Sequence, residues 1–227
     1  MSFDRVVGRY WEDDSLAVTR QVSAENPTGR HGSGARSVPD PSDPLLAYSG
    51  PALVLGRGFK VRPYVPLGAG ETLTLAEFEG SGVITHLFVT SDLANYQDLR
   101  LRCFWDGSGQ PAVDAPLGAF FGIGHGTHPH ELVSLPVQVG PSRGCSSYWP
   151  MPFSDGARIT LENTGPVDAG VIAYRVVFEK GGKPLPLPRF YARWARTETG
   201  EATPSHVVLP TVRGSLSGAF KVLCPIV

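Results

Sequence analysis

The sequence has no clear excess of either basic or acidic residues. Its 20 lysine and arginine residues are balanced by 21 aspartate and glutamate residues, which leaves a formal net charge of -1. A nucleic-acid-binding domain normally carries a clustered basic footprint, and a surface that binds anionic lipid carries a polybasic segment. The balanced composition therefore predicts neither a nucleic-acid partner nor a membrane partner.

Long apolar runs and cysteine are also scarce. The chain contains no run of about 18 apolar residues, the length that crosses a bilayer, and residues 1–11 lack the apolar segment of a secretory signal. The three cysteines, Cys103, Cys145 and Cys224, are far apart, which argues against a disulfide framework or a zinc ribbon. We expect a cytoplasmic protein with reduced thiols and no cofactor.

Glycine and proline, by contrast, are abundant, with 27 and 21 residues. Both interrupt helices, and an apolar fraction of 41% is too high for a disordered chain, so the composition favours an ordered fold with many turns. Between residues 105 and 153, aromatic residues repeatedly stand beside glycine and proline in short stretches. We expect these aromatic side chains to fill the space between two packed sheets.

Short segments with alternating apolar and polar residues predict the strands. Residues 72–78 and 99–105 alternate with a period of two, which is typical of an antiparallel strand with one buried face. Strands are also expected over residues 59–65, 83–90, 132–139, 145–151, 157–162 and 171–178. About eight short strands separated by turns predict an all-β protein, an antiparallel jelly-roll β-sandwich.

The segments outside these strands predict how the chain is divided. Residues 1–45 are interpreted as an N-terminal arm of mostly loop composition, with one or two helical turns over residues 11–20. Residues 46–180 are expected to form the first jelly-roll domain. A glycine- and lysine-rich boundary at residues 180–184 follows, and residues 181–227 are interpreted as a linker and the truncated, incomplete start of a second jelly roll.

Two carboxylates, Glu77 and Glu79, stand two residues apart in an expected strand, so their side chains point to the same face. Glycosidases use a carboxylate pair, but they place it in a cleft and separate the two pKa values. The simpler interpretation is that both residues lie at the solvent-exposed end of a strand, before the turn at residues 80–82. We therefore assign neither residue a catalytic role.

A histidine-rich loop follows the aromatic segment at residues 120–122 and contains His125, His128, His130 and Glu131. Three imidazoles and a carboxylate can ligate zinc or iron, so a metal-binding, cupin-like protein is one alternative function. The spacing matches no strict metal motif. An exposed loop or a subunit contact is the main interpretation, and no metal site is assigned.

The loop that contains Glu25 and Asn26 has no apolar periodicity and is ordered by Pro27. Carboxylate and amide groups are suitable partners for sugar hydroxyls, so Glu25 and Asn26 are predicted to bind substrate. The alternative for Asn26 is an Asx-type turn ahead of Pro27. Trp105 is predicted as a third substrate-binding residue because its ring can stack on a sugar, with core filling as its alternative role.

Several motifs follow one another in a fixed order along the chain. They are SAENPTG (residues 23–29), LGRGFK (55–60), GETLTLAEFEG (70–80), VITH (83–86), WDG (105–107), PLGAFFG (116–122), YWPMPF (148–153) and ARITLEN (157–163). Together they resemble glycoside hydrolase family 172, which was first described as domain of unknown function 2961. The resemblance spans about residues 17–213.

This resemblance implies two tandem jelly rolls in a homo-oligomer, a trimer or hexamer, with carbohydrate as the other partner. It also implies hydrolysis or transglycosylation of furanosides, such as fructofuranose or arabinofuranose, by a retaining mechanism. In the family, one glutamate is the nucleophile and another the acid/base, and both belong to the second jelly roll. The family's Gly-Thr-Gly-Thr-Glu-Asp-Tyr segment is absent here, so we expect an N-terminal portion without catalytic residues.

A second function class shares the expected fold. A non-catalytic carbohydrate-binding module and a structural β-sandwich are both built as stacked sheets, and a fold alone does not determine function. Both stay open at this stage, beside the cupin-like alternative described above.

Overall fold

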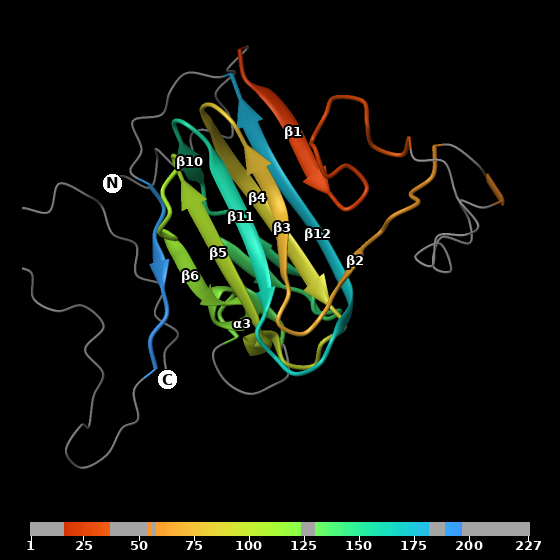
Figure 1. The fold of residues 1–227 in the computed structure, drawn as a ribbon, viewed down its shortest axis with the longest axis vertical. Helices are drawn as coiled ribbons and strands as arrows, with labels where there is room; N and C mark the ends of the chain where they lie inside the picture. Colours follow the sequence, from red (N-terminus) through yellow and green to blue (C-terminus); the bar gives the residue numbers. More distant parts are fainter. Residues whose placement is uncertain (1–15, 37–53, 56–57, 124–129, 182–188, 197–227) are drawn as a thin grey trace, which may run out of the picture.

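The computed structural model describes residues 16–36, 54–55, 58–123, 130–181 and 189–196. Within these residues, two β-sheets pack face to face as two layers (Figure 1). The prediction of an all-β sandwich is confirmed. In the described part of the chain, none of the helices has the length and apolar character that a membrane crossing requires.

The larger sheet contains eight strands. Its main path runs in the order β1, β12, β4, β9, β8 and β7, while β2 pairs with β12 and β10 pairs with β4. All of these pairings are antiparallel. The strands are β1 (Val18–Ser23), β2 (Val65–Leu67), β4 (Gly82–Ser91), β7 (Leu132–Val133), β8 (Val137–Val139), β9 (Cys145–Ser147), β10 (Met151–Phe153) and β12 (Ala169–Lys180).

The smaller sheet has five strands in the order β13, β6, β5, β11 and β3. Its only parallel pairing among the described strands joins β13 to β6. A 3-10 turn, η3 (Tyr96–Asp98), and a single helical turn, α3 (Leu117–Phe120), lie near one end of the sandwich (Figure 1). The strands are β3 (Thr72–Phe78), β5 (Leu99–Trp105), β6 (Val113–Pro116), β11 (Ala157–Asn163) and β13 (Ala192–Arg193).

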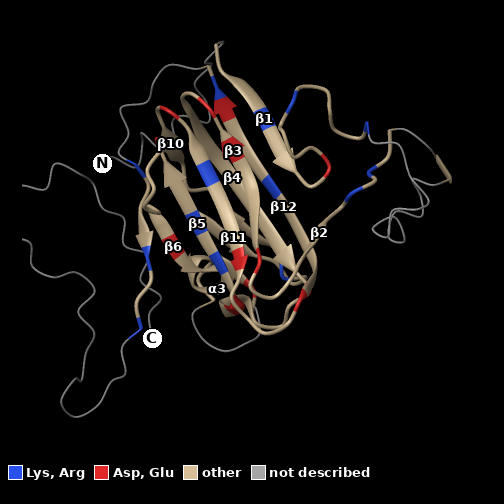
Figure 2. Ribbon diagram, viewed as in Figure 1, with Lys and Arg blue, Asp and Glu red and all other residues tan. Residues whose placement is uncertain are grey.

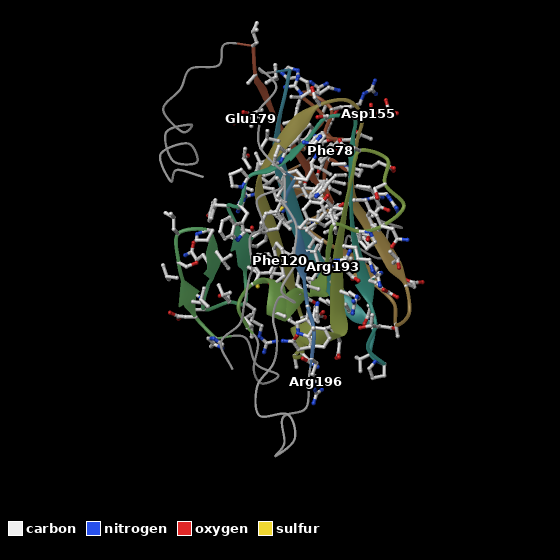
Figure 3. All side chains as sticks on the ribbon, turned by 90° about the vertical axis from the view of Figure 1, so that its left-hand side faces the viewer. Phe78, Phe120, Asp155, Glu179, Arg193 and Arg196 are labelled. Carbon is white, nitrogen blue, oxygen red and sulfur yellow. The ribbon has the colours of Figure 1, made fainter. Side chains whose placement is uncertain are left out.

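The hydrophobic core lies between the two sheets. Leucines 99 and 101 on β5 are fully buried and alternate with the partly exposed arginines 100 and 102, as the period-two pattern predicts. Phe78 of the smaller sheet contacts two rings of the larger sheet, with ring centres 5.8 Å from Phe153 and 4.0 Å from Phe178. Figure 3 shows Phe78 between the two layers when the sandwich is seen from the side.

The first described segment differs from the prediction. Residues 18–23 form β1 and pair with β12, with Val22 opposite Val176 and Ser23 opposite Arg175, so the prediction of helical turns is wrong for residues 18–20. The strand forms because Val22 gains a buried position against β12. Part of the segment interpreted as an arm is therefore an edge strand of the larger sheet.

The last described segment also belongs to the sandwich. Residues 189–196, predicted to lie in the linker after residue 180, contribute β13 to the smaller sheet. The Trp105 indole donates a hydrogen bond to the carbonyl of Phe190 at 2.7 Å. The Asp106 carboxylate accepts a hydrogen bond from the Arg189 guanidinium at 2.5 Å and others from the backbone amides of Ser154 and Asp155. These bonds fix the segment on the sheet edge.

Three expected strands have different bounds in the structure. Residues 59–64 form no strand, and the ladder begins only at Val65. The expected strand over residues 132–139 is divided into β7 and β8, because Pro136 lacks a backbone N–H group between them. The expected strand over residues 145–151 is divided into β9 and β10 just before Met151, where Pro150 has the same effect.

Candidate functional site

A pocket of about 750 Å³ lies beside β1 on the outer face of the larger sheet. On β1, Gln21 and Ser23 line it and alternate with the buried Val22. On β12, Arg175 lines it and alternates with the buried Val176. Since successive side chains of a strand point to opposite faces, this pocket opens away from the core. The remaining lining comes mainly from residues 25–35 and from Lys60, Pro63 and Phe88.

The loop after β1 is held by its own hydrogen bonds. The backbones of Ser23 and Asn26 form an isolated β-bridge, and the Asn26 side-chain amide donates to the carbonyl of Arg30 at 3.0 Å. Gly29 has a φ of +63°, and a Cβ at this position would lie 2.9 Å from the Val22 side chain. Only glycine fits here without strain, so the local sequence fixes how the loop turns over the sheet.

Glu25 joins this loop to the segment that precedes β2. Its Oε2 accepts hydrogen bonds from the backbone amides of Val61, at 3.0 Å, and Arg62, at 2.5 Å. Its Oε1 is buried and has no hydrogen-bond partner among the described residues. Glu25 therefore holds Lys60 and Pro63 in place along the opposite wall of the pocket.

Replacing Glu25 by Gln is expected to loosen this wall. The amide oxygen of Gln is a weaker acceptor than a carboxylate, because hydrogen bonds to charged groups are worth about 1.5–3 kcal/mol and neutral ones about 1 kcal/mol. The exchange rates of the Val61 and Arg62 amide protons should rise by about tenfold, measured by native-state hydrogen exchange. The Glu77→Gln variant is the control, and equal rates in both variants would contradict the anchoring role.

Cationic side chains from separate segments meet at this pocket. Arg175 lies on β12, Arg30 in the loop and Lys60 ahead of β2, while Glu25 is the only carboxylate among the described lining residues. None of these three cations has a salt bridge with a described carboxylate. Arg20 of β1 also borders the pocket, but it shares the parity of the buried Val22, so its side chain is directed to the other face of the strand. In Figure 2, Lys and Arg lie on β1 and on the two coil segments beside it.

A histidine and an aromatic ring stack on the same outer face of the larger sheet, outside the pocket lining. His86 and Phe88 alternate with buried residues of β4, so both point outward. The His86 ring stacks on Tyr148 with centres 4.8 Å apart, and Tyr148 is 39% exposed. Burial, followed by the nearby charge of Arg175, lowers the pKa of His86 from its usual value. A neutral imidazole next to an exposed ring is a surface on which a sugar can stack.

The structure brings two of the three predicted substrate-binding residues together. Glu25 and Asn26 both line the pocket, and both also serve the loop, since Asn26 forms the turn that was its alternative role. Trp105 lies elsewhere: it is 3% exposed, packs in the core and donates to Phe190. Core filling, the alternative role for Trp105, therefore describes its position in the structure.

The other candidates do not form a site within the described residues. Glu77 and Glu79 are exposed and do not line the pocket. His130 and Glu131 are exposed, whereas His125 and His128 lie outside the described residues. In the part of the chain that the structure describes, no three His, Cys, Asp or Glu residues are grouped so that they could hold a metal ion.

The cations of the pocket were missed by sequence reasoning. Arg30 lies in a loop whose sequence has no apolar periodicity, and Lys60 lies in the strand predicted over residues 59–65. The alternation of β12 does place Arg175 on the outer face, but which segments meet there depends on the pairing of β1 with β12. That pairing joins residues far apart in the sequence, and local patterns do not report it.

A comparison with protein families identifies the core of this sandwich. Residues 61–171 match the model of a family described as GH172 domain-like. No curated protein matches the chain. The matched residues include β2 to β11 but exclude β1, the loop at residues 25–35 and most of β12, so most of the pocket lies outside the match. Residues 61–171, just under half of the chain, are therefore similar to the GH172-like domain of a glycoside hydrolase-related family.

Proposed function

We propose that this chain is the N-terminal jelly-roll portion of a retaining glycoside hydrolase that acts on furanosides of the fructofuranose or arabinofuranose type. In this proposal the chain contributes a wall of the sugar-binding site, and the catalytic glutamate pair is not among its residues. The observation that carries the proposal is a GH172-like domain whose adjoining pocket is lined, among the described residues, by a single carboxylate.

The chemistry of a retaining glycosidase requires more than this pocket offers. Two carboxyl groups must lie about 5–5.5 Å apart, one as nucleophile and one as acid/base. Glu25 has one oxygen engaged with two backbone amides and the other buried, so neither oxygen is placed to attack a sugar. What the pocket does offer is polar groups that can bind hydroxyls, including Ser23, Asn26 and His31.

The proposed partners are carbohydrate and further copies of the same chain, in a trimer or hexamer. A homo-oligomer is supported by exposed apolar side chains on the β7–β8 hairpin, where Val133 and Leu135 are open to solvent. The proposal also places the protein in the cytoplasm, where the buried thiols of Cys103 and Cys145 stay reduced.

An activity measurement tests the proposal. The purified chain is expected to release no product from 4-nitrophenyl α-L-arabinofuranoside or from a fructofuranose disaccharide above the uncatalysed rate. It is nevertheless expected to bind an arabinofuranose oligosaccharide in an isothermal titration. Turnover that disappears in the Glu25→Gln or Glu77→Gln variant would show that carboxylates of this chain suffice, which the proposal denies.

The same measurements distinguish the two non-catalytic alternatives from the proposed function. A structural β-sandwich would show neither turnover nor binding. A stand-alone carbohydrate-binding module would bind pyranose and furanose oligosaccharides without distinction, because ring stacking alone selects weakly between them. The proposal requires that the furanose ligand binds more tightly.

A further inference from the structure

We propose that the pocket beside β1 takes a saccharide that carries an oxyanion substituent, a carboxylate, sulfate or phosphate group. The saccharide part of this inference rests on the proposed function. The anionic substituent goes beyond it, because the furanosides named above are uncharged. Three cations from separate segments of the chain, Arg30, Lys60 and Arg175, carry the inference.

Several arginines outside the pocket are paired with carboxylates. On the outer face of the smaller sheet, Arg100 binds Asp114 at 2.6 Å and Arg102 binds Glu162 at 2.6 Å. Arg189 is likewise paired with Asp106. On that face Arg100 and Arg102 are paired with carboxylates, and Arg158 lies over the ring of Phe104.

The pocket departs from this pattern. Its cations have no carboxylate partner among the described residues, and they come from β12 and from two loop segments. The Arg175 guanidinium lies 5.8 Å from the centre of the Phe88 ring. Like charges gathered in one concave site repel one another, and they raise the local concentration of anions.

The single acid of the pocket offsets only part of this charge. Glu25 binds the backbone amides of Val61 and Arg62 through one oxygen, and its other oxygen is buried. A neutral sugar needs acceptors for its hydroxyl groups as well as donors. This pocket is rich in charged donors instead, and Arg and Lys bind carboxylate, sulfate and phosphate oxygens with charge-assisted hydrogen bonds.

The shape of the site favours a compact ligand over a nucleic acid. The pocket has a volume of about 750 Å³, within the range of small-molecule sites, and a formal net charge of -1 gives the chain no excess of basic residues for a phosphate backbone. Gly32 and Gly34 border it without a Cβ, and nothing lies within 4 Å of the Cβ position of Gly34. The ligand we infer is therefore one or a few sugar units with a charged group.

The test compares four sugars that differ in one substituent. Methyl arabinofuranoside is titrated into the purified chain, and so are its 5-phosphate, its 5-sulfate and the corresponding uronate. At least one charged sugar is expected to bind about tenfold more tightly than the neutral one, as one additional charge-assisted hydrogen bond provides. That preference should shrink several-fold between 50 and 300 mM sodium chloride, because salt screens exposed charges.

Variants locate the binding. The Arg30→Gln and Lys60→Gln substitutions together should remove the preference for the charged sugar over the neutral one. Arg158→Gln is the matched control: this arginine lies on the smaller sheet, 4.1 Å from the ring centre of Phe104, and does not line the pocket. Thermal unfolding of each variant establishes that the fold is intact.

Each other outcome overturns the inference. Equal affinity for neutral and charged sugars would overturn it and leave the proposed function standing. Inorganic phosphate or sulfate that binds as tightly as the charged sugar would show a simple anion site, and a single-stranded oligonucleotide that binds more tightly would show a nucleic-acid surface. Absence of all binding would overturn both the inference and the proposed sugar-binding role.

Discussion

The Phe178→Ala variant is expected to lose about 3–5 kcal/mol of unfolding free energy, the range for buried phenylalanines. Phe178 lies on β12, is only 6% exposed and meets the Phe78 ring of the opposite sheet at 4.0 Å between centres. It thus joins the two layers of the sandwich. It also lies beneath the pocket loop, since the Cβ position of Gly29 is 3.6 Å from its ring.

Urea unfolding followed by circular dichroism measures this loss, provided that the slope of the transition stays constant. Phe104→Ala is the matched control, because Phe104 is partly exposed on the outer face of the smaller sheet under Arg158. Its loss should be about 1 kcal/mol. Similar losses for both variants would contradict the assignment of Phe178 to the core that joins the sheets.

Tyr96→Phe is expected to cost about 1–3 kcal/mol, although it removes only one oxygen atom. The buried Tyr96 hydroxyl accepts a hydrogen bond from the Ser91 amide at 2.8 Å and lies 3.0 Å from the carbonyl oxygens of Ser91 and Arg143, to which it can donate. Burial, the largest influence, raises the pKa of Tyr96, so the hydroxyl remains a donor at neutral pH. Phenylalanine would leave the Ser91 amide buried without this partner.

The same unfolding measurement checks this prediction against Tyr148→Phe, in which an exposed hydroxyl is removed. That control should change the unfolding free energy by about 0.5 kcal/mol or less. The Tyr96 variant should also exchange the Ser91 amide proton faster than the wild-type chain. A Tyr96→Phe variant as stable as the control would mean that water or a backbone shift replaces the lost hydrogen bonds.

Several strands were predicted from the sequence with nearly correct bounds. The strands expected at residues 72–78 and 99–105 are present with those bounds, and those expected at 157–162 and 171–178 are slightly longer in the structure. β5 and most of β12 have a buried face that imposes a period of two on their residues, whereas β3 and β11 depart from it where their register shifts between Ile159 and Thr160. Only the last two residues of β1 are buried, so the pattern before Val22 did not predict a strand, and helical turns were predicted over residues 11–20 instead.

The candidate site was predictable only in part. The loop with Glu25 and Asn26 could be selected because polar, proline-ordered loops often carry function. The sequence does not indicate that the Glu25 carboxylate, predicted to bind substrate, accepts hydrogen bonds from the backbone amides of Val61 and Arg62. The sequence also does not indicate that Lys60 and Arg175 line the same pocket, because that arrangement depends on pairing between distant segments.

Ligands of this chain are expected to bind in the pocket beside β1 and not on the charged outer face of the smaller sheet. Amide chemical shifts of an isotope-labelled sample, titrated with an arabinofuranose oligosaccharide, measure where they bind. We predict changes concentrated in residues 20–35, 60–63 and 173–175. Changes confined to Arg100, Arg102, Glu162 and their neighbours, or no changes at saturating ligand, would contradict the claim.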